Sequence, residues 1–283
     1  MPTPEQIKSL VHQIPEPDEG GTYANLDMNK VEQIANVVAQ LDKGGRDSVL
    51  GLIDLLVEPG SGANVKAHFA LHLLAVHVTQ KGNEQARAEF ARAIASQVGG
   101  DRPKATQIYL IEQLQLTGTK AVVETLGKAL LDPELCGPAA RALTSIRDGA
   151  AEQFLSALPS VRGHQRLSII NNLAVLRAPQ AVDAFRRALE DPDPDTRIAA
   201  AWGIARIADS SATDALAKCA ETHEGWERIN ETDACLLLAE NLLAVGKKSD
   251  AAAIYTYLLK TRTDPSERHV CEAARRGLAT AAG

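Results

Sequence analysis

The chain has 283 residues, of which 45% are hydrophobic, 4% aromatic and 23% charged, and its formal net charge at pH 7 is -6. This acidic balance opposes general nucleic-acid binding, which relies on clustered lysines and arginines that neutralise phosphates. Aromatic residues are scarce and alanine is abundant, which favours closely packed helices, because alanine loses no rotamer entropy and lets backbones approach.

Residues 1–26 are predicted to form an N-terminal arm or linker in front of a helical domain that spans residues 27–283. Within this arm, residues 4–13 could form a short helix with one apolar face. Two prolines and two glycines between residues 15 and 21 then break regular structure.

The domain is expected to begin with a helix whose apolar residues recur at helical spacing. They are Met28, Val31, Ile34, Val38 and Leu41. Asp27 or Asn25 could cap its first turn, and Gly44 with Gly45 ends it. We interpret this helix as the N-terminal cap of an array.

Seven pairs of helices are predicted after the cap, separated by turns rich in glycine or proline, such as residues 59–62. The pairs cover residues 46–80, 83–116, 119–147, 149–176, 179–208, 211–245 and 248–281. Their second helices repeat a small-small-large pattern, as in Ala200, Ala201 and Ile204. One pair cannot bury both of its apolar faces, so neighbouring pairs must stack. The pattern therefore predicts an all-α fold, a right-handed α-solenoid of about seven helical hairpins.

The fifth pair contains the most regular turn, in which Asp191-Pro-Asp-Pro-Asp-Thr-Arg197 is followed by Ile-Ala-Ala-Ala. This segment resembles HEAT repeats, specifically the short bacterial type first noted in phycobilin lyases. Those repeats carry an Asp-Pro pair, an arginine and two alanines between their helices. The resemblance implies a HEAT-like solenoid over residues 45–281, with one unit near the consensus.

The basic residue of this motif varies from pair to pair. Arg166 occupies its position in the fourth pair, and Lys66 and Lys104 occupy it in the first two. In the third, sixth and seventh pairs no basic residue is expected, because the position falls on Cys136, Thr232 and Glu267. The resemblance implies that the turn aspartates and Arg197 hydrogen-bond within and between repeats as a ladder. The alternative is a ridge of basic residues that attracts an acidic partner.

Arrays of this type expose a long concave face formed by their second helices, where partners dock. The sequence shows no convergent polar site, so we expect a non-enzymatic scaffold that binds another protein through this face. We expect no catalytic residue, metal, cofactor, nucleic acid or membrane contact, and the sequence specifies no oligomeric state. The candidate partner-binding residues are Arg166, Asn171, Asn172, Arg197 and Arg206.

Histidine and cysteine residues do not indicate a metal site by their spacing. His68 and His72 share a helix face but lack the glutamate of a His-Glu-x-x-His motif. No cysteine belongs to a CxxC pair, so we expect small buried apolar residues, with a conceivable disulfide between Cys235 and Cys271. His223-Glu224 is a single His-Glu dipeptide, whereas deoxyhypusine hydroxylases, which are built from HEAT repeats, use several to hold two irons.

Two alternatives follow from the same architecture. The chain could be an accessory module that positions the catalytic domain of a larger enzyme, with residues 15–21 as the interdomain linker. A lyase or DNA glycosylase of HEAT-like repeats is less favoured. A glycosylase would need Trp202 or Trp226 beside a carboxylate in a basic groove, and the net charge opposes this.

The sequence lacks signals for export and for membrane insertion. Its first residues have neither the basic nor the apolar region of a secretory signal. No stretch approaches the roughly 20 apolar residues that a membrane-spanning helix needs. We therefore expect a cytoplasmic protein.

Overall fold

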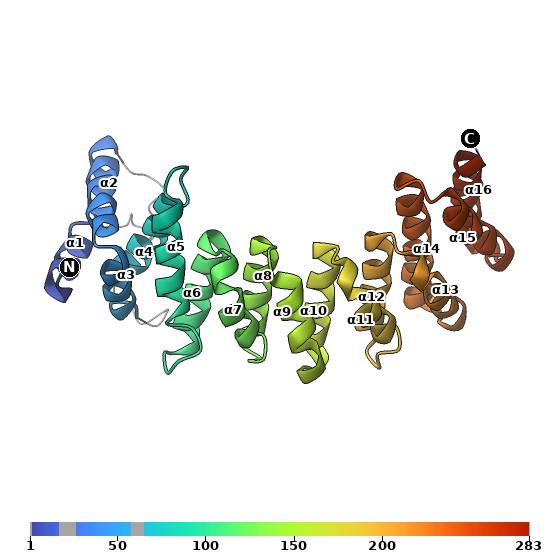
Figure 1. Cartoon of the computed structure of the whole chain (residues 1–283), viewed down its shortest axis with the longest axis horizontal. Coiled ribbons are helices and arrows are strands. Elements are labelled where there is room, and N and C mark those ends of the chain that lie inside the picture. The colour runs from blue at the N-terminus through green and yellow to red at the C-terminus, as the bar shows by residue number, and fades with distance from the viewer. Residues whose placement is uncertain (1, 17–26, 58–64, 283) are drawn as a thin grey trace. The chain divides into compact units, whose positions relative to one another are not determined.

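The structure is a computed structural model that describes residues 2–16, 27–57 and 65–282. Within these ranges it consists of sixteen α-helices and five short 3-10 helices, with no strand (Figure 1). The chain divides into two compact units, Met1–Gln153 and Phe154–Gly283, here called unit 1 and unit 2. Each unit is a stack of helices that pack against their sequence neighbours, as expected for an all-α solenoid.

Unit 1 contains the first helices of the array. They are α1 (Pro4–His12), α2 (Met28–Lys43), α3 (Gly45–Asp54), α4 (Val65–Val78), α5 (Glu84–Ala95), α6 (Lys104–Thr117), η1 (Lys120–Val122), α7 (Val123–Ala129) and α8 (Cys136–Ile146). Helices α1, α3 and α5 pack in succession, and so do α2, α4, α6 and α8. The unit ends within α9 (Ala150–Ala157).

The pair α1–α2 begins this succession, although the sequence suggested a lone capping helix. Thr3 and Gln6 form a reciprocal capping box at the start of α1, which explains why so short a helix forms. Ile7 and Val11 of α1 and Ile14 after it are buried, and α1 contacts α2, α3 and α4. The apolar face of α1 therefore completes the first hairpin. The predicted boundary at residue 26 stays a prediction, because residues 17–26 lie outside the described ranges.

Unit 2 continues the alternation of first and second helices. Its elements are η2 (Leu158–Ser160), α10 (Gly163–Leu176), η3 (Pro179–Ala181), α11 (Val182–Ala188), α12 (Pro194–Ile207), η4 (Ser210–Ala212), α13 (Thr213–Thr222), α14 (Gly225–Ala244), α15 (Lys248–Thr261), η5 (Pro265–Glu267) and α16 (Arg268–Ala282). Helix α12 packs against both α10 and α14, which also contacts α16. The second helices thus form one layer of the unit.

Small residues make this close packing of second helices possible. Ala199, Ala200 and Ala201 of α12 are buried, and Gly203 faces the ring of Phe185 from α11. A Cβ atom on Gly203 would lie 2.5 Å from that ring. The alanine-rich pattern therefore works as predicted, because short side chains let neighbouring helices approach.

The seven predicted pairs match the seven consecutive pairs from α3–α4 to α15–α16. The predicted turn at residues 59–62 lies outside the described ranges. Several predicted first helices are shorter in the structure, because a 3-10 turn precedes the α-helix, as η3 precedes α11. No described helix combines the length and the apolar character needed to cross a bilayer.

Candidate functional site

The turn between α11 and α12 organises the middle of unit 2. The Asp193 carboxylate accepts hydrogen bonds from the backbone N–H of Thr196 at 3.2 Å and from its hydroxyl at 2.7 Å, and so caps α12. This hydroxyl contact lowers the pKa of Asp193. Pro194 occupies the first helical position, where its missing N–H costs nothing. The predicted start of this helix at Asp195 is therefore correct to one residue.

Three arginines connect consecutive hairpins of unit 2, and we call Arg166, Arg197 and Arg228 the arginine ladder. Arg166 donates to the carboxylate of Asp191 in the next turn. Arg197 donates to the backbone oxygen of Asp191 at 2.6 Å and forms a two-pronged ion pair with Glu227, its second contact measuring 2.8 Å. Arg197 therefore hydrogen-bonds within and between repeats, as the ladder interpretation of this residue predicted.

Arg228 extends the ladder into the last hairpins. Its guanidinium binds both oxygens of Glu267, at 2.9 and 3.1 Å, and donates to the backbone oxygen of Ala220 at 3.1 Å. Two-pronged arginine–carboxylate pairs combine charge with fixed geometry. The pairs hold α14 against both α13 and the segment before α16.

The prediction that the sixth pair lacks a basic residue is wrong. Helix α14 begins at Gly225, about one turn earlier than expected, so Arg228 and not Thr232 takes the ladder position. Each ladder arginine is the fourth residue of its helix, and 31 residues separate each from the next. This constant spacing was the signal that could have found Arg228.

The structure distributes the five candidate partner-binding residues between buried junctions and open surface. The side chains of Arg166 and Arg197 are only 20% and 17% exposed and are occupied by the ladder. Asn172 is half-buried and donates to the backbone oxygen of Ser168 at 2.8 Å. Asn171 and Arg206 are exposed on α10 and α12. Partner binding through these residues stays a prediction.

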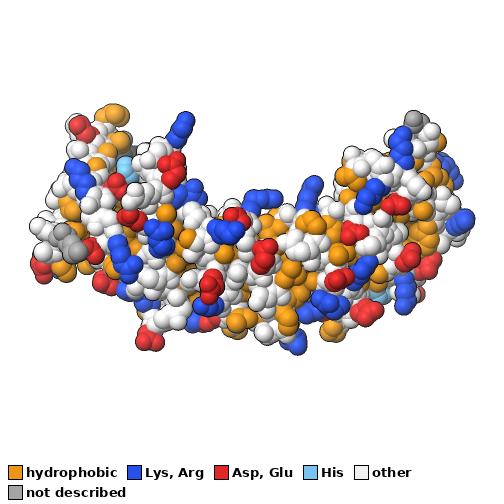
Figure 2. Space-filling model, viewed as in Figure 1, with side chains coloured by type: hydrophobic (Ala, Val, Ile, Leu, Met, Phe, Trp, Pro, Cys, Tyr) orange, Lys and Arg blue, Asp and Glu red, His pale blue; other side chains and the backbone are white. Residues whose placement is uncertain are grey.

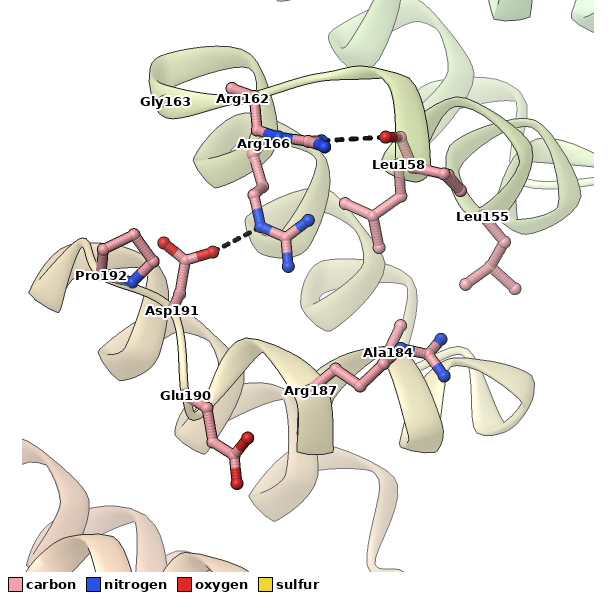
Figure 3. Close-up of a pocket in the computed structure, with 11 residues that line it drawn as sticks. Leu155, Leu158, Arg162, Gly163, Arg166, Ala184, Arg187, Glu190, Asp191 and Pro192 are labelled. Carbon is pink, nitrogen blue, oxygen red and sulfur yellow. Dashed lines mark hydrogen bonds and ion pairs between the residues drawn. The ribbon is translucent and has the colours of Figure 1, made fainter.

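A groove of about 630 Å³ opens beside the ladder, between the α9–α10 turn and the α11–α12 hairpin (Figure 3). Its apolar lining comes from Leu155, Leu158, Pro159, Ala184 and Pro192. All of these residues belong to unit 2. Ligand-binding sites combine a concave apolar lining with placed polar groups, and here the polar groups are three arginines and two acids.

Three arginines and two acids line the groove, which leaves a net charge of +1. Arg166 points to Asp191 and is neutralised there, while Glu190 points away from this pair (Figure 3). Arg162 is exposed and donates to two carbonyl oxygens, those of Pro159 at 2.9 Å and Val161 at 2.7 Å. Carbonyl groups satisfy its hydrogen bonds but leave its charge uncompensated.

Arg187 supplies a second uncompensated charge. It is exposed on α11 and pairs with no carboxylate among the described residues. The groove therefore presents an apolar floor with Arg162 and Arg187 at its edge. The groove could not be predicted from the sequence, because its lining combines residues from two hairpins whose contact no local pattern specifies.

The histidines of α4 and the two tryptophans make local contacts or are exposed. His68 lies edge-to-face with Tyr109, their ring centroids 4.8 Å apart, and His72 contacts the amide oxygen of Gln113 at 3.1 Å. Trp226 is 70% exposed, whereas Trp202 is half-buried. All four cysteines are free, so the conceivable disulfide is not formed.

Part of the chain matches a known repeat family. The family model for HEAT repeats matches residues 164–235, and no curated protein sequence matches the chain. Among solved structures, an engineered protein is 18% identical, with 99% of this chain and 85% of the other covered and a TM-score of 0.47. Human deoxyhypusine hydroxylase in complex with glycerol is 14% identical, with coverages of 98% and 96% and a TM-score of 0.34.

A second engineered protein is 17% identical, with coverages of 97% and 96% and a TM-score of 0.26. The residues matched by the family model run from the first turn of α10 to the middle of α14. They include the Asp191 turn and all three arginines of the ladder. The match to the HEAT-repeat model therefore coincides with the segment that contains the arginine ladder.

Proposed function

We propose that the chain is a non-enzymatic repeat scaffold that binds another protein, and that the groove of unit 2 contacts this partner. The observation that carries the proposal is the apolar floor beside the uncompensated charges of Arg162 and Arg187. The fitting ligand is a protein segment that places an apolar side chain next to an acidic one. The apolar group would cover the floor, and the carboxylate would pair with an arginine.

The composition of the groove supports binding over catalysis. The residues that line it include no histidine, cysteine, serine or lysine, which are the usual nucleophiles and proton-transfer groups. Of its two acids, Asp191 is held by Arg166 and Glu190 is exposed. This lining offers contacts and charge complementarity without a reactive group.

The distribution of surface charge supports a protein partner over a nucleic acid. On the face shown in Figure 2, basic and acidic side chains are interspersed over both units. Nucleic-acid binding depends on phosphate neutralisation by basic side chains gathered on one face. The four free cysteines fit a reducing compartment, so we include a cytoplasmic location in the proposal.

The experiment compares two surfaces of unit 2 by crosslinking and affinity capture. One variant carries Arg162→Glu and Arg187→Glu in the groove, and the matched control carries Asn171→Asp and Arg206→Glu on the second helices. All four positions are exposed, so both variants should keep the helical circular dichroism and melting temperature of the wild type. We expect a specific protein that the wild type captures to be lost with the groove variant and retained by the control.

If only the control variant fails to capture the protein, the interaction lies on the second-helix face, as predicted from the sequence. This outcome would contradict the groove assignment. Equal capture by all three proteins would contradict both surfaces. Turnover of a small substrate by the purified wild type, abolished in the groove variant, would overturn the non-enzymatic part of the proposal.

A further inference from the structure

A cysteine, a histidine and a glutamate meet where α13 ends and α14 passes beside it. Cys219 lies in the last turn of α13, His223 directly follows that helix, and Glu231 lies in α14. Ligand-type atoms of these three side chains all lie within 4.8 Å of one another. The break between α13 and α14 therefore brings together Cys219, His223 four residues later and Glu231 eight residues after that.

The histidine ring is the centre of this cluster. Its Nδ1 atom lies 2.9 and 3.0 Å from the two carboxylate oxygens of Glu231 and 3.0 Å from Oε1 of Glu227. One ring nitrogen can donate only one proton, so it cannot satisfy all three oxygens at once. Three carboxylate oxygens therefore converge on one nitrogen, which is more acceptors than its single proton can satisfy.

Glu231 has the greatest need for a polar partner, because its side chain is 0% exposed. The nearest guanidinium, that of Arg197, is committed to Glu227 and to the backbone of Asp191. Among the described residues, His223 is the polar partner that holds the Glu231 carboxylate. Buried carboxylates are ordinarily paired with a cation or coordinate a metal.

We propose that Cys219, His223 and Glu231 bind a divalent transition-metal ion of the zinc type. Thiolate sulfur, imidazole nitrogen and carboxylate oxygen are the three donor types that Zn²⁺ takes in proteins. Softer metals would demand more sulfur, and Ca²⁺ or Mg²⁺ would demand oxygen ligands alone. The metal replaces the proton between Nδ1 and the carboxylate and the proton of the thiol.

The distances are close to those of a metal site. Tetrahedral Zn²⁺ separates its nitrogen, oxygen and sulfur ligands by about 3.3–3.6 Å, given bonds of about 2.0–2.3 Å. The Nδ1 atom of His223 lies 2.9 and 3.0 Å from the oxygens of Glu231, so this pair has to open by about 0.3–0.7 Å to reach the zinc range. The ligand atoms all lie within 4.8 Å of one another, so Cys219 has to close by at most roughly 1.5 Å. Its Sγ atom makes only a long contact of 3.9 Å with the backbone oxygen of Leu189, so the thiol is free to turn.

The local charge also suits a dication. With the thiolate formed, Cys219, Glu231 and Glu227 carry three negative charges, and Arg197 carries one positive charge. The remaining charge of about -2 equals what Zn²⁺ neutralises. Glu224, the second residue of the His-Glu dipeptide, is exposed and is not among the ligand atoms. The proposed site is therefore unlike a site assembled from several His-Glu dipeptides.

Solvent reaches this cluster through a second groove of about 390 Å³ in unit 2, whose lining includes Cys219, Thr222 and His223. A metal ion can enter there without unfolding of the helices. Three protein ligands leave a fourth coordination position, which a water molecule from this groove would occupy. The arrangement has the ligands, the charge and the entry path that a metal site requires.

The test uses the full chain, freed of metal with a chelator, in zinc titration calorimetry and cobalt absorption spectroscopy. We expect one Zn²⁺ per chain, a higher melting temperature with Zn²⁺, and a thiolate-to-cobalt charge-transfer band with Co²⁺. Cys219→Ser should abolish that band and weaken zinc binding at least about tenfold. The matched control is Cys271→Ser, whose half-buried thiol lies outside the cluster, and it should behave as the wild type.

His223→Gln is the second variant, because it removes the central ligand without touching a cysteine, and it should lose the zinc effect on the melting temperature. Circular dichroism of both variants confirms that the helices remain folded. The proposal is overturned if the folded wild type takes up no Zn²⁺ at micromolar concentration. It is equally overturned if Cys219→Ser and His223→Gln bind Zn²⁺ as tightly as the wild type.

Discussion

Units 1 and 2 stack their helices in the same way but connect them with different polar groups. In unit 2, Arg197 and Arg228 form two-pronged pairs with Glu227 and Glu267. Arg166 makes a single contact with Asp191. In unit 1 the corresponding contacts are single lysine pairs, Lys104 with Asp132 and Lys66 with Glu16. A lysine makes a point contact, whereas an arginine fork also fixes orientation.

In unit 1 a buried amide side chain also helps to hold a turn between helices. Gln107 is almost fully buried and accepts a hydrogen bond from the backbone N–H of Gly99 at 2.8 Å. It also donates to the backbone oxygens of Gly100 and Arg102 at 3.0 and 2.8 Å. The α5–α6 turn is therefore held from its own second helix. Apolar stacking is therefore common to both units, whereas the polar groups that connect their helices differ.

Because apolar stacking is shared, removal of a core side chain should cost the two units about the same. Leu110→Ala in unit 1 and Ile204→Ala in unit 2 each truncate a side chain with no exposed surface. We expect each to lower the free energy of unfolding by about 2–5 kcal/mol, through lost burial and the cavity left behind. Urea denaturation measures this loss, and a clearly smaller loss in unit 1 would contradict shared stacking.

Substitutions at the polar junctions should lower the free energy of unfolding by different amounts in the two units. Arg197→Ala leaves Glu227 partly buried without its fork, and we expect a loss of about 2–3 kcal/mol. Lys104→Ala removes a more exposed pair with Asp132 and should cost at most about 1 kcal/mol. Arg197→Lys should fall between them, because lysine keeps the charge but not the fork. Equal losses for Arg197→Ala and Lys104→Ala in thermal unfolding would erase the distinction between the units.

Substitution of two helical glycines by alanine should change the free energy of unfolding in opposite directions. Gly203→Ala in α12 would press a methyl group against the Phe185 ring at 2.5 Å, and overpacking of this kind costs about 1–3 kcal/mol. Gly137→Ala in α8 meets only the flexible end of Arg141 at 3.7 Å, so helix propensity should stabilise it by about 0.5–1 kcal/mol. Differential scanning calorimetry of both variants gives the two signs, and a stabilised Gly203→Ala would refute the close packing of α11 on α12.

The smallest expected effect concerns the cap of α12. The pKa of Asp193 is lowered because Thr196 donates to its carboxylate, so the folded-state pKa is below the unfolded value of about 4. The resulting stability is present above pH of about 4 and is lost as the pH falls through the folded-state pKa. Asp193→Ala should cost about 1 kcal/mol at neutral pH.

The effect of Asp193→Ala should also depend on pH. The difference in unfolding free energy between wild type and Asp193→Ala should shrink as acid protonates the wild-type cap. Unfolding at pH 7 and at pH 3 measures the change. Asp132 in unit 1 also has a lowered pKa, chiefly through its contact with Lys104, so Asp132→Ala should follow the same direction. A difference that grows in acid would contradict both assignments.

Much of the fold could be predicted, because the signals for it are local. Helical periodicity located α2, and Asp27 caps it as expected by accepting from the backbone N–H of Lys30 at 2.9 Å. The repeat motif predicted the ladder role of Arg197, since its turn partner lies only six residues away. Arg228 escaped because its partner Glu267 lies 39 residues away, and helix boundaries carry an uncertainty of a few residues.

The amino-acid sequence by itself determined the helices, their pairing in order and the apolar faces that stack, because turn residues and the 3.6-residue period act within one hairpin. Only the tertiary structure decided which polar groups meet across hairpins. Arg162 and Arg187 line one groove, and Cys219 lies near Glu231, because of how each hairpin is rotated on its neighbour. That rotation depends on the packing of many side chains together, and no short segment encodes it.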